Sequence, residues 1–332
     1  MPVADAHRRG LRLALATAIV PAMLVAAGCG SDDEAETSAS APAPSAADFP
    51  APDGRSVEEI YANATPTDDL VLAPTGQVYN EGENRFGFGV FTAGREQITD
   101  AEVAIYAGPP DGPAEGPFPA RIEDMKTDPA FAAKTTTDDP DAAKVVYVAD
   151  IDLAKPGRTD LVALIHEGDG LRSVRIAPSL DVGRFGDVPV AGDKAPVIDT
   201  PTADEVDDLS EIDTRDPHDT MHEENFADVV GEKPVVLTFA TPLLCQSRVC
   251  GPVVDISEQL KSEYGDEIAF IHQEIFEDND INKGLRDQVK QYGLPTEPWV
   301  YVVDADGNIS TAIEGAYGVS ELTDAVEKVA PS

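Results

Sequence analysis

Cysteine thiols are the side chains of this chain best suited to covalent chemistry, and only three occur among its 332 residues. Two of them, Cys245 and Cys250, follow an apolar run at 235–240 and precede an apolar-periodic segment. A strand before the pair and a helix after it are therefore predicted. A thiol at a helix N-terminus faces unpaired N–H groups and the positive end of the helix dipole, which favour the thiolate. Arg248 favours it as well, so we predict that Cys245 attacks and Cys250 resolves.

The spacing of the two cysteines restricts how they can pair. Five residues along a continuous helix correspond to a rise of about 7.5 Å and a rotation of about 500°. A disulfide requires Cα atoms within about 7 Å, so Cys245 must precede the helix or the first turn must unwind on oxidation. Pro252 allows two arrangements: it starts the helix and leaves both cysteines in a loop, or it kinks a helix already begun.

The segments around the pair predict an α/β domain. Strands are expected at 235–240, 267–276, 299–303 and 308–314, and helices end near 264, 292 and 329. The first three strands are joined by helical crossovers and the last two by a hairpin at 304–307, which gives the order β-α-β-α-β-β-α.

This order, the cysteine pair at the first strand-to-helix junction and the segment YGLPTEP at 292–298 together resemble the thioredoxin-like superfamily. The chain looks most like the membrane-tethered bacterial thioredoxin-like and redoxin lipoproteins. The resemblance covers residues 190–332 and implies an α/β thioredoxin-like domain that acts on protein thiols and disulfides with an unidentified redox partner. It also implies a cis bond before Pro298, packed beside the cysteines, and it favours the kinked helix. Glu297 departs from the family pattern, in which this neighbour of the proline is usually uncharged.

Two functions other than thiol–disulfide exchange remain open from the cysteine pair itself. A structural disulfide in an exported binding protein is one, because exported proteins often staple loops in this way. A peroxidase is another, since one peroxiredoxin branch uses the same C-x4-C spacing. That branch expects a threonine three positions before the reactive cysteine, where this chain has Pro242; Thr241 lies one position early.

Copper handling is a further alternative, because two thiolates and a histidine could hold a copper ion. The candidates are His272 on the second strand, and His218 with His222 beside Met221. We predict instead that His218 and His222 are solvated residues at the start of a helix. His272 is predicted to be a strand residue whose ring nitrogen is hydrogen-bonded. We therefore expect no metal ligands and no cofactor.

The N-terminus has the features of an export signal. Basic residues at 8–12 precede an apolar run at 13–27, which is too short, at 15 residues, for a spanning helix. The segment LVAAGC ending at Cys29 resembles the lipobox of bacterial lipoproteins. This resemblance implies removal of a signal peptide, residues 1–28, and lipidation of Cys29, so the protein is expected on the outer side of a bacterial cell membrane. Residues 29–66 are acidic and then rich in Ala, Pro and Ser, and are predicted to be a disordered tether.

Residues 67–185 are predicted to form an all-β domain. Apolar residues alternate with polar ones in several short segments, as at Phe86, Phe88 and Val90. About seven such segments suggest an immunoglobulin-like sandwich. Two long polar loops, at 108–119 and 127–141, carry no cluster with ligand spacing, so a structural or spacer role is favoured for this domain.

The charge of the chain is strongly negative. It has 24 basic and 62 acidic residues, a formal net charge of −38. Such a charge repels nucleic acid, so nucleic acid is not expected as a partner. Residues 199–228 hold twelve acidic residues against one basic residue, Arg215, and the sequence TMHE at 220–223 predicts a capped helix from Met221.

Overall fold

The computed structural model describes residues 40–168 and 170–330. The predicted signal peptide, the lipidation site at Cys29 and the first part of the predicted tether lie outside these residues. Within the described residues, no helix is both long enough and apolar enough to cross a membrane.

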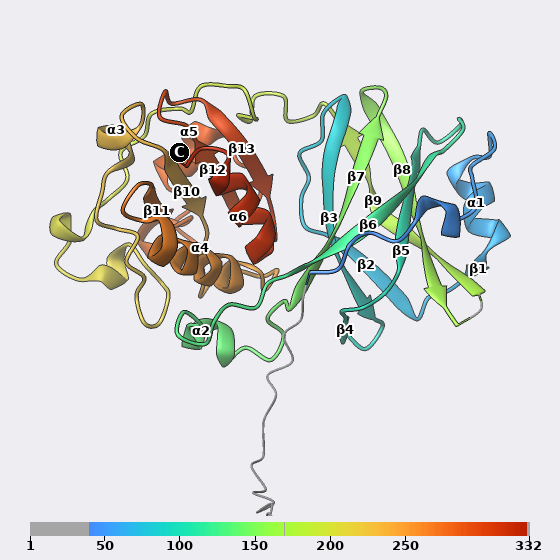
Figure 1. The fold of residues 1–332 in the computed structure, drawn as a ribbon, viewed down its shortest axis with the longest axis horizontal. Helices are drawn as coiled ribbons and strands as arrows, with labels where there is room; N and C mark the ends of the chain where they lie inside the picture. Colours follow the sequence, from blue (N-terminus) through green and yellow to red (C-terminus); the bar gives the residue numbers. More distant parts are fainter. Residues whose placement is uncertain (1–39, 169, 331–332) are drawn as a thin grey trace, which may run out of the picture. The chain divides into compact units, whose positions relative to one another are not determined.

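The C-terminal part, residues 188–330 (the α/β region), is built on a four-stranded sheet in the order β11-β10-β12-β13 (Figure 1). The strands are β10 (Val235–Phe239), β11 (Ala269–Gln273), β12 (Trp299–Val303) and β13 (Ile309–Glu314). β10 is parallel to β11 and antiparallel to β12, which forms a hairpin with β13. The helices are α3 (Phe226–Val229), α4 (Cys250–Tyr264), α5 (Asp287–Tyr292) and α6 (Val319–Glu327), with short 3-10 turns η2 (Ala203–Glu205), η3 (Leu209–Glu211) and η4 (Glu277–Asn279). The predicted order of strands and helices is confirmed, and the region is a mixed α/β fold.

Both faces of this sheet are covered, which explains its continuously apolar strands. Val236, Val300 and Val302 pack on one face against α4 and α6. Leu237 and Tyr301 point to the other face, where they pack against α5 and α3. Every residue of β10, β11 and β12 is buried. A rigid layer thus supports the loop that follows β10.

The N-terminal part, residues 40–185 (the β region), contains a nine-stranded sheet in the order β1-β9-β8-β5-β6-β7-β3-β2, with β4 paired to β3. Its strands are β1 (Thr65–Pro66), β2 (Leu70–Pro74), β3 (Gly82–Thr92), β4 (Gln97–Ile98), β5 (Val103–Gly108), β6 (Glu115–Asp124), β7 (Val145–Leu153), β8 (Gly157–Glu167) and β9 (Gly170–Val182). The predicted burial of alternating residues such as Phe86, Phe88 and Val90 is confirmed.

The two separate sheets of an immunoglobulin-like sandwich are not confirmed. β6 pairs with β5 at its start and with β7 at its end, so the strands form one hydrogen-bonded sheet. The two ends of that sheet approach each other, because Arg172 of β9 lies 3.4 Å from the carboxylate of Asp69, next to β2. The region is therefore a curled sheet.

The predicted disordered tether is wrong for residues 40–66. Ala41 pairs with Ile122 of β6, and η1 (Ala46–Asp48) precedes a buried Phe49. Helix α1 (Val57–Asn63) begins with a Ser56 capping box and buries Ile60 against the β region. A few well-spaced apolar residues are enough to hold this acidic, Pro-rich segment on the sheet.

The helix predicted from Met221 begins five residues later, at Phe226, where Asn225 caps it. The expected capping pair is engaged elsewhere: the Thr220 hydroxyl bonds to Glu258 of α4, and Glu223 pairs with Lys261 at 2.8 Å. Tertiary partners thus override the local capping signal, and residues 219–225 remain irregular.

Candidate active site

The two cysteines lie at the junction between β10 and α4, in different local structures. Cys245 is in the connecting loop and is 8% exposed, whereas Cys250 is the first residue of α4 and is fully buried. Pro252 lies in the first turn of the helix, where an N–H group would have no helical partner in any case. The structure therefore adopts neither of the two arrangements expected from Pro252. Cys245 precedes the helix, as the spacing requires, and Cys250 begins it.

Cys245 is poised as a thiolate. A hydrogen bond from the Cys250 thiol lowers the pKa of Cys245 to about 5 against the opposing effect of burial. The Ser247 hydroxyl, 3.2 Å from Cys245 Sγ, and the backbone N–H groups of Val249 and Cys250 act in the same direction. The predicted contribution of N–H groups at the helix start is therefore present.

Arg248 does not have the role predicted for it. Its guanidinium group lies 2.8 Å from the Asp139 carboxylate, and its side chain is 52% exposed. The groups that stabilise the Cys245 thiolate are instead the Cys250 thiol, the Ser247 hydroxyl and backbone N–H groups. An ion pair with the β region thus holds Arg248, and Ser247 is the neighbour of functional interest that the sequence did not single out.

Cys250 has the opposite character. Burial raises the pKa of the Cys250 thiol well above its ordinary value, and its hydrogen bond to Cys245 raises it further. The pair therefore holds one shared proton on the inner sulfur and negative charge on the outer one. This asymmetry separates an attacking from a resolving thiol.

The segment before β12 completes the site. The Glu297–Pro298 peptide bond is cis, the geometry that the family resemblance implies, and Pro298 is buried. Burial raises the pKa of Glu297 to about 7, and the charge of Cys245 adds to this effect. A carboxyl group with this pKa can accept or release a proton near neutral pH. The departure from the family pattern at Glu297 thus places a proton-exchanging group beside the dithiol.

Two clefts flank the cysteine loop. One, of about 570 Å³, is lined by Cys245, Leu243 and residues of the loop at 134–142. The other, of about 750 Å³, is lined by Ser247, Glu297 and residues of β2 and β3. The α/β region therefore provides the sulfurs, and the β region provides part of both walls.

The loop at 127–141, which includes α2 (Lys134–Thr137), packs directly on α4. The backbone N–H of Ala133 donates to Asp255 of α4, which also pairs with Arg215 at 2.8 Å. A Cβ atom on Gly251 would lie only 2.7 Å from Thr136 Oγ1, so glycine permits this close approach. The β region was expected to have a structural or spacer role, but its loop also forms a wall of the site.

Further contacts join the β region and the α/β region, which belong to one compact unit. Arg85 and Arg121 pair with Glu321 of α6 at 2.6 and 3.1 Å. Glu314 of β13 accepts hydrogen bonds from the backbone N–H groups of Gln77 and Val78. These buried and half-buried pairs orient the cleft walls.

Of the three histidines considered as copper ligands, one lies in an environment that was not predicted. His272 is satisfied as predicted, with Nδ1 2.7 Å from Asp219 and Nε2 3.2 Å from the Ala240 carbonyl. His218 is exposed, as predicted. His222, however, was expected to be solvated and is only 2% exposed, because residues 219–225 turn inward instead of forming a helix entrance.

Twelve chains of solved structures are similar to this chain, and one of them is described below. No protein-family model and no curated protein sequence matches this chain. A solved structure described as a thiol:disulfide interchange protein DsbE from Chlorobium tepidum aligns with a TM-score of 0.32 and 16% sequence identity. The alignment covers 42% of this chain and 98% of that chain. The strand order and connections of the α/β region agree with the predicted order β-α-β-α-β-β-α.

Proposed function

We propose that this protein is a thiol–disulfide oxidoreductase that acts on cysteines of other proteins through Cys245 and Cys250. The observation that carries the proposal is the asymmetry of the two thiols: a slightly exposed thiolate receives a hydrogen bond from a buried, protonated partner. A thiol pair that served only as a structural staple would not require this asymmetry.

In the reducing direction, Cys245 attacks one sulfur of a substrate disulfide and forms a mixed disulfide, while the other substrate sulfur leaves as a thiolate. Cys250 then loses its proton and attacks Cys245 Sγ. The Cys245–Cys250 disulfide forms, the mixed disulfide breaks and the second substrate sulfur leaves as a thiolate. Two electrons pass to the substrate, and a redox partner returns the pair to the dithiol.

Glu297 is the proposed acceptor of the Cys250 proton. Its negative charge acts on Cys250, as it does on Cys245. Once Cys245 is bound in a mixed disulfide, Cys250 no longer has a thiolate to which it can donate a hydrogen bond. A carboxylate with a pKa of about 7 can then take the proton without binding it too tightly to release it.

The substrate is proposed to be an extended protein segment lying in the two clefts. Leu243, 66% exposed beside Cys245, offers an apolar contact to such a segment. Asp139 and its neighbours add acidic groups along the same cleft. A segment with an apolar residue near its cysteine and basic residues beyond it fits this surface.

Attachment to the outer face of a bacterial cell membrane through lipid at Cys29 is part of the proposal and depends on residues 1–29 of the sequence. Fractionation of cells that express the full chain tests it. We expect the protein in the membrane fraction and its release when Cys29 is replaced by Ala. Membrane retention of Cys29→Ala would contradict lipid anchoring at this residue.

A graded redox titration tests the enzymatic proposal. The full chain is equilibrated in buffers of defined potential, its thiols are trapped, and the oxidised fraction is followed by mass. We expect a two-electron transition between about −270 and −120 mV, the range of thiol oxidoreductases, and its absence in Cys250→Ser. A midpoint below about −300 mV would identify a structural disulfide instead.

Two further measurements separate the remaining alternatives. Consumption of hydrogen peroxide that is lost in Cys245→Ser, without exchange activity on protein disulfides, would favour a peroxidase. Stoichiometric binding of Cu(I) that requires both thiols would favour copper handling. Exchange with a reduced or oxidised model protein, together with neither of these results, supports the oxidoreductase.

A further inference from the structure

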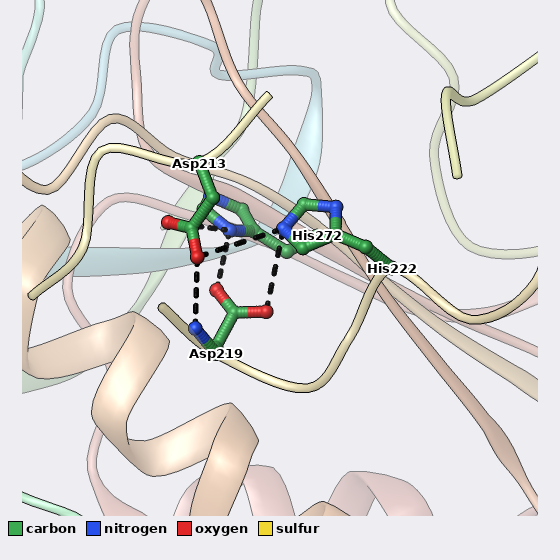
Figure 2. A group of neighbouring side chains, drawn as sticks. All are labelled: Asp213, Asp219, His222 and His272. Carbon is green, nitrogen blue, oxygen red and sulfur yellow. Dashed lines mark hydrogen bonds and ion pairs between the residues drawn. The ribbon is translucent and has the colours of Figure 1, made fainter. Parts of the chain in front are cut away.

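A second group of ionisable side chains is buried near the end of β10. The histidine–aspartate cluster consists of Asp213, Asp219, His222 and His272, and Figure 2 shows its carboxylates and rings pointing toward one another. One ligand atom from each side chain can be chosen so that all four lie within 4.8 Å of one another. All four side chains are buried. Two carboxylates and two imidazoles form a common donor set for a divalent transition metal.

His222 is the member of this cluster that lacks hydrogen bonds among the described residues. It is 2% exposed, and among the described residues neither of its ring nitrogens has a hydrogen-bond partner. Its Nε2 lies 3.4 Å from Asp219 Oδ1 and 3.9 Å from Asp213 Oδ2, without hydrogen-bond geometry to either atom. Burying an unpartnered polar group is costly, and an ion bound at Nε2 removes the cost at that nitrogen.

His272 has the orientation of a metal ligand. Its Nε2 lies 3.2 Å from the Ala240 carbonyl, which can only accept, so Nε2 carries the donated hydrogen. Nδ1 then faces Asp219 at 2.7 Å and Asp213 at 4.0 Å. A metal-binding histidine usually donates its other ring N–H to a carbonyl or a carboxylate in this way. An ion would take the place of the hydrogen between Nδ1 and Asp219.

The carboxylates are held in place by the backbone. Asp213 accepts hydrogen bonds from the N–H groups of Arg215 at 2.7 Å and Asp219 at 2.8 Å. Asp219 accepts one from the N–H of Met221 at 2.8 Å. These bonds fix both carboxylates toward the rings before any ion binds, and such outer contacts are a regular part of metal sites.

The charges of the cluster also fit a divalent cation. When both imidazoles are neutral, as metal ligands must be, the two carboxylates give the cluster a charge of −2, which one divalent ion neutralises. His218, 35% exposed, lies 3.4 Å from Asp213 Oδ2 at the edge of the cluster. Ca²⁺ and Mg²⁺ prefer oxygen ligands alone, whereas Zn²⁺ accepts nitrogen and oxygen together.

We propose that Asp213, Asp219, His222 and His272 bind one divalent transition-metal ion, represented by Zn²⁺, in a closed four-coordinate site. Zinc bonds of about 2.0–2.1 Å place tetrahedral ligands about 3.3 Å apart, so the most widely separated atoms need to move by roughly 1.5 Å. Four protein ligands leave no open position, which is typical of a structural ion. The site ties residues 213–222 to β11. It is independent of the proposed redox function.

The test uses the full chain with Cys245→Ser and Cys250→Ser, so that the dithiol cannot bind the ion. After dialysis against a chelator, the chain is titrated with Zn²⁺ by calorimetry. We expect one ion per chain and a rise of about 5 °C or more in Tm at saturation. Co²⁺ should give the visible absorption bands of a tetrahedral nitrogen and oxygen site.

His222→Phe is the decisive variant, and His166→Phe on β8 is its matched control. His222→Phe removes a ligand but fills the space with an apolar ring, so the metal-free chain should keep or exceed its Tm. Its Zn²⁺ affinity should fall at least about 100-fold, whereas His166→Phe should leave affinity unchanged. If His222→Phe does not fold, Asp213→Asn, which keeps the shape of the side chain, should show the same loss.

Two results would overturn the proposal. One is the absence of Zn²⁺ binding at micromolar concentrations in the dithiol-free chain. The other is binding that is equal in His222→Phe, or in Asp213→Asn where that variant is used, and in His166→Phe. Either result would identify the cluster as a buried ion-pair network only.

Discussion

The dithiol site and the histidine–aspartate cluster both lie near the C-terminal end of β10, and they accommodate buried charge in opposite ways. At the dithiol, one negative charge is placed on Cys245, the more exposed of two sulfurs, and is stabilised by donors. At the cluster, two carboxylates are buried together with a ring, His222, that makes no hydrogen bond among the described residues. The first arrangement suits exchange with a partner, and the second suits a bound cation.

The difference shows that burial and charge must be considered together. A thiolate that borders a cleft can react, because hydrogen-bond donors stabilise its charge while the sulfur stays accessible. A closed pair of carboxylates cannot reach a substrate and is favourable only with a compensating positive charge, either on His272 or on a bound cation. Each of the following variants should therefore affect one site and leave the other largely intact.

Cys245→Ser should have the largest effect. A serine hydroxyl is not ionised near neutral pH, so exchange with a model protein disulfide should fall by at least about 10³-fold. The measurement is the initial rate of disulfide reduction at pH 7. Cys250→Ser should instead accumulate a mixed disulfide, visible as an increase in intact mass. Both variants should retain Zn²⁺ binding, and loss of binding in either would mean that the two sites are not separate.

Asp219→Ala should cause the next largest effect, on stability. It leaves His272, whose pKa is raised to about 10 mainly by Asp219 against the effect of burial, without its closest counter-charge. Removal of one partner of a buried pair costs about 3–5 kcal/mol of unfolding free energy. Urea denaturation in the presence of a chelator measures this change, with exposed Glu232→Ala as the control. Equal stability of the two variants would contradict a tightly coupled cluster.

Glu297→Gln should slow the second half of the exchange reaction. In the native protein, resolution of the mixed disulfide should speed up as pH rises through about 7, since only ionised Glu297 can accept the Cys250 proton. The variant should lose this inflection and resolve about 10²-fold more slowly at pH 7. Stopped-flow release of a chromophoric thiol measures the step. An unchanged pH profile would assign the proton to water instead.

Ser247→Ala and Arg248→Ala form the most sensitive comparison. Alkylation of Cys245 should rise with pH through about 5 and level off above it, because the thiolate is then fully formed. Ser247→Ala removes a hydrogen bond to the thiolate and should lower the rate at pH 5 by roughly 2- to 10-fold. Arg248→Ala, which loses an exposed ion pair with Asp139, should stay within about 2-fold of the native rate. The reverse order would restore the role first predicted for Arg248.

Local sequence patterns were sufficient for the α/β region. β10 and β12 are short runs of buried apolar residues, and the chain turns back directly after Val303 to form a hairpin. Their positions can be predicted because each depends on residues that are adjacent in the sequence. The same reasoning failed at Met221, where the capping signal was real but Glu258 and Lys261 of α4 competed for the same side chains. It failed also at residues 40–66, because the surface on which Ile60 packs lies on distant strands.

The order of strands and helices in the α/β region and the position of the cysteine pair could be predicted from the sequence, because both depend on short-range periodicity and spacing. The donors that stabilise the Cys245 thiolate, the ion pair of Arg248 with Asp139 and the role of the loop at 127–141 as a wall of the site became apparent only in the folded protein. Folding alone also brought His272 beside Asp219, from 53 residues away along the chain. Such contacts join separate segments, and their energies depend on burial and orientation, neither of which is encoded in any local pattern.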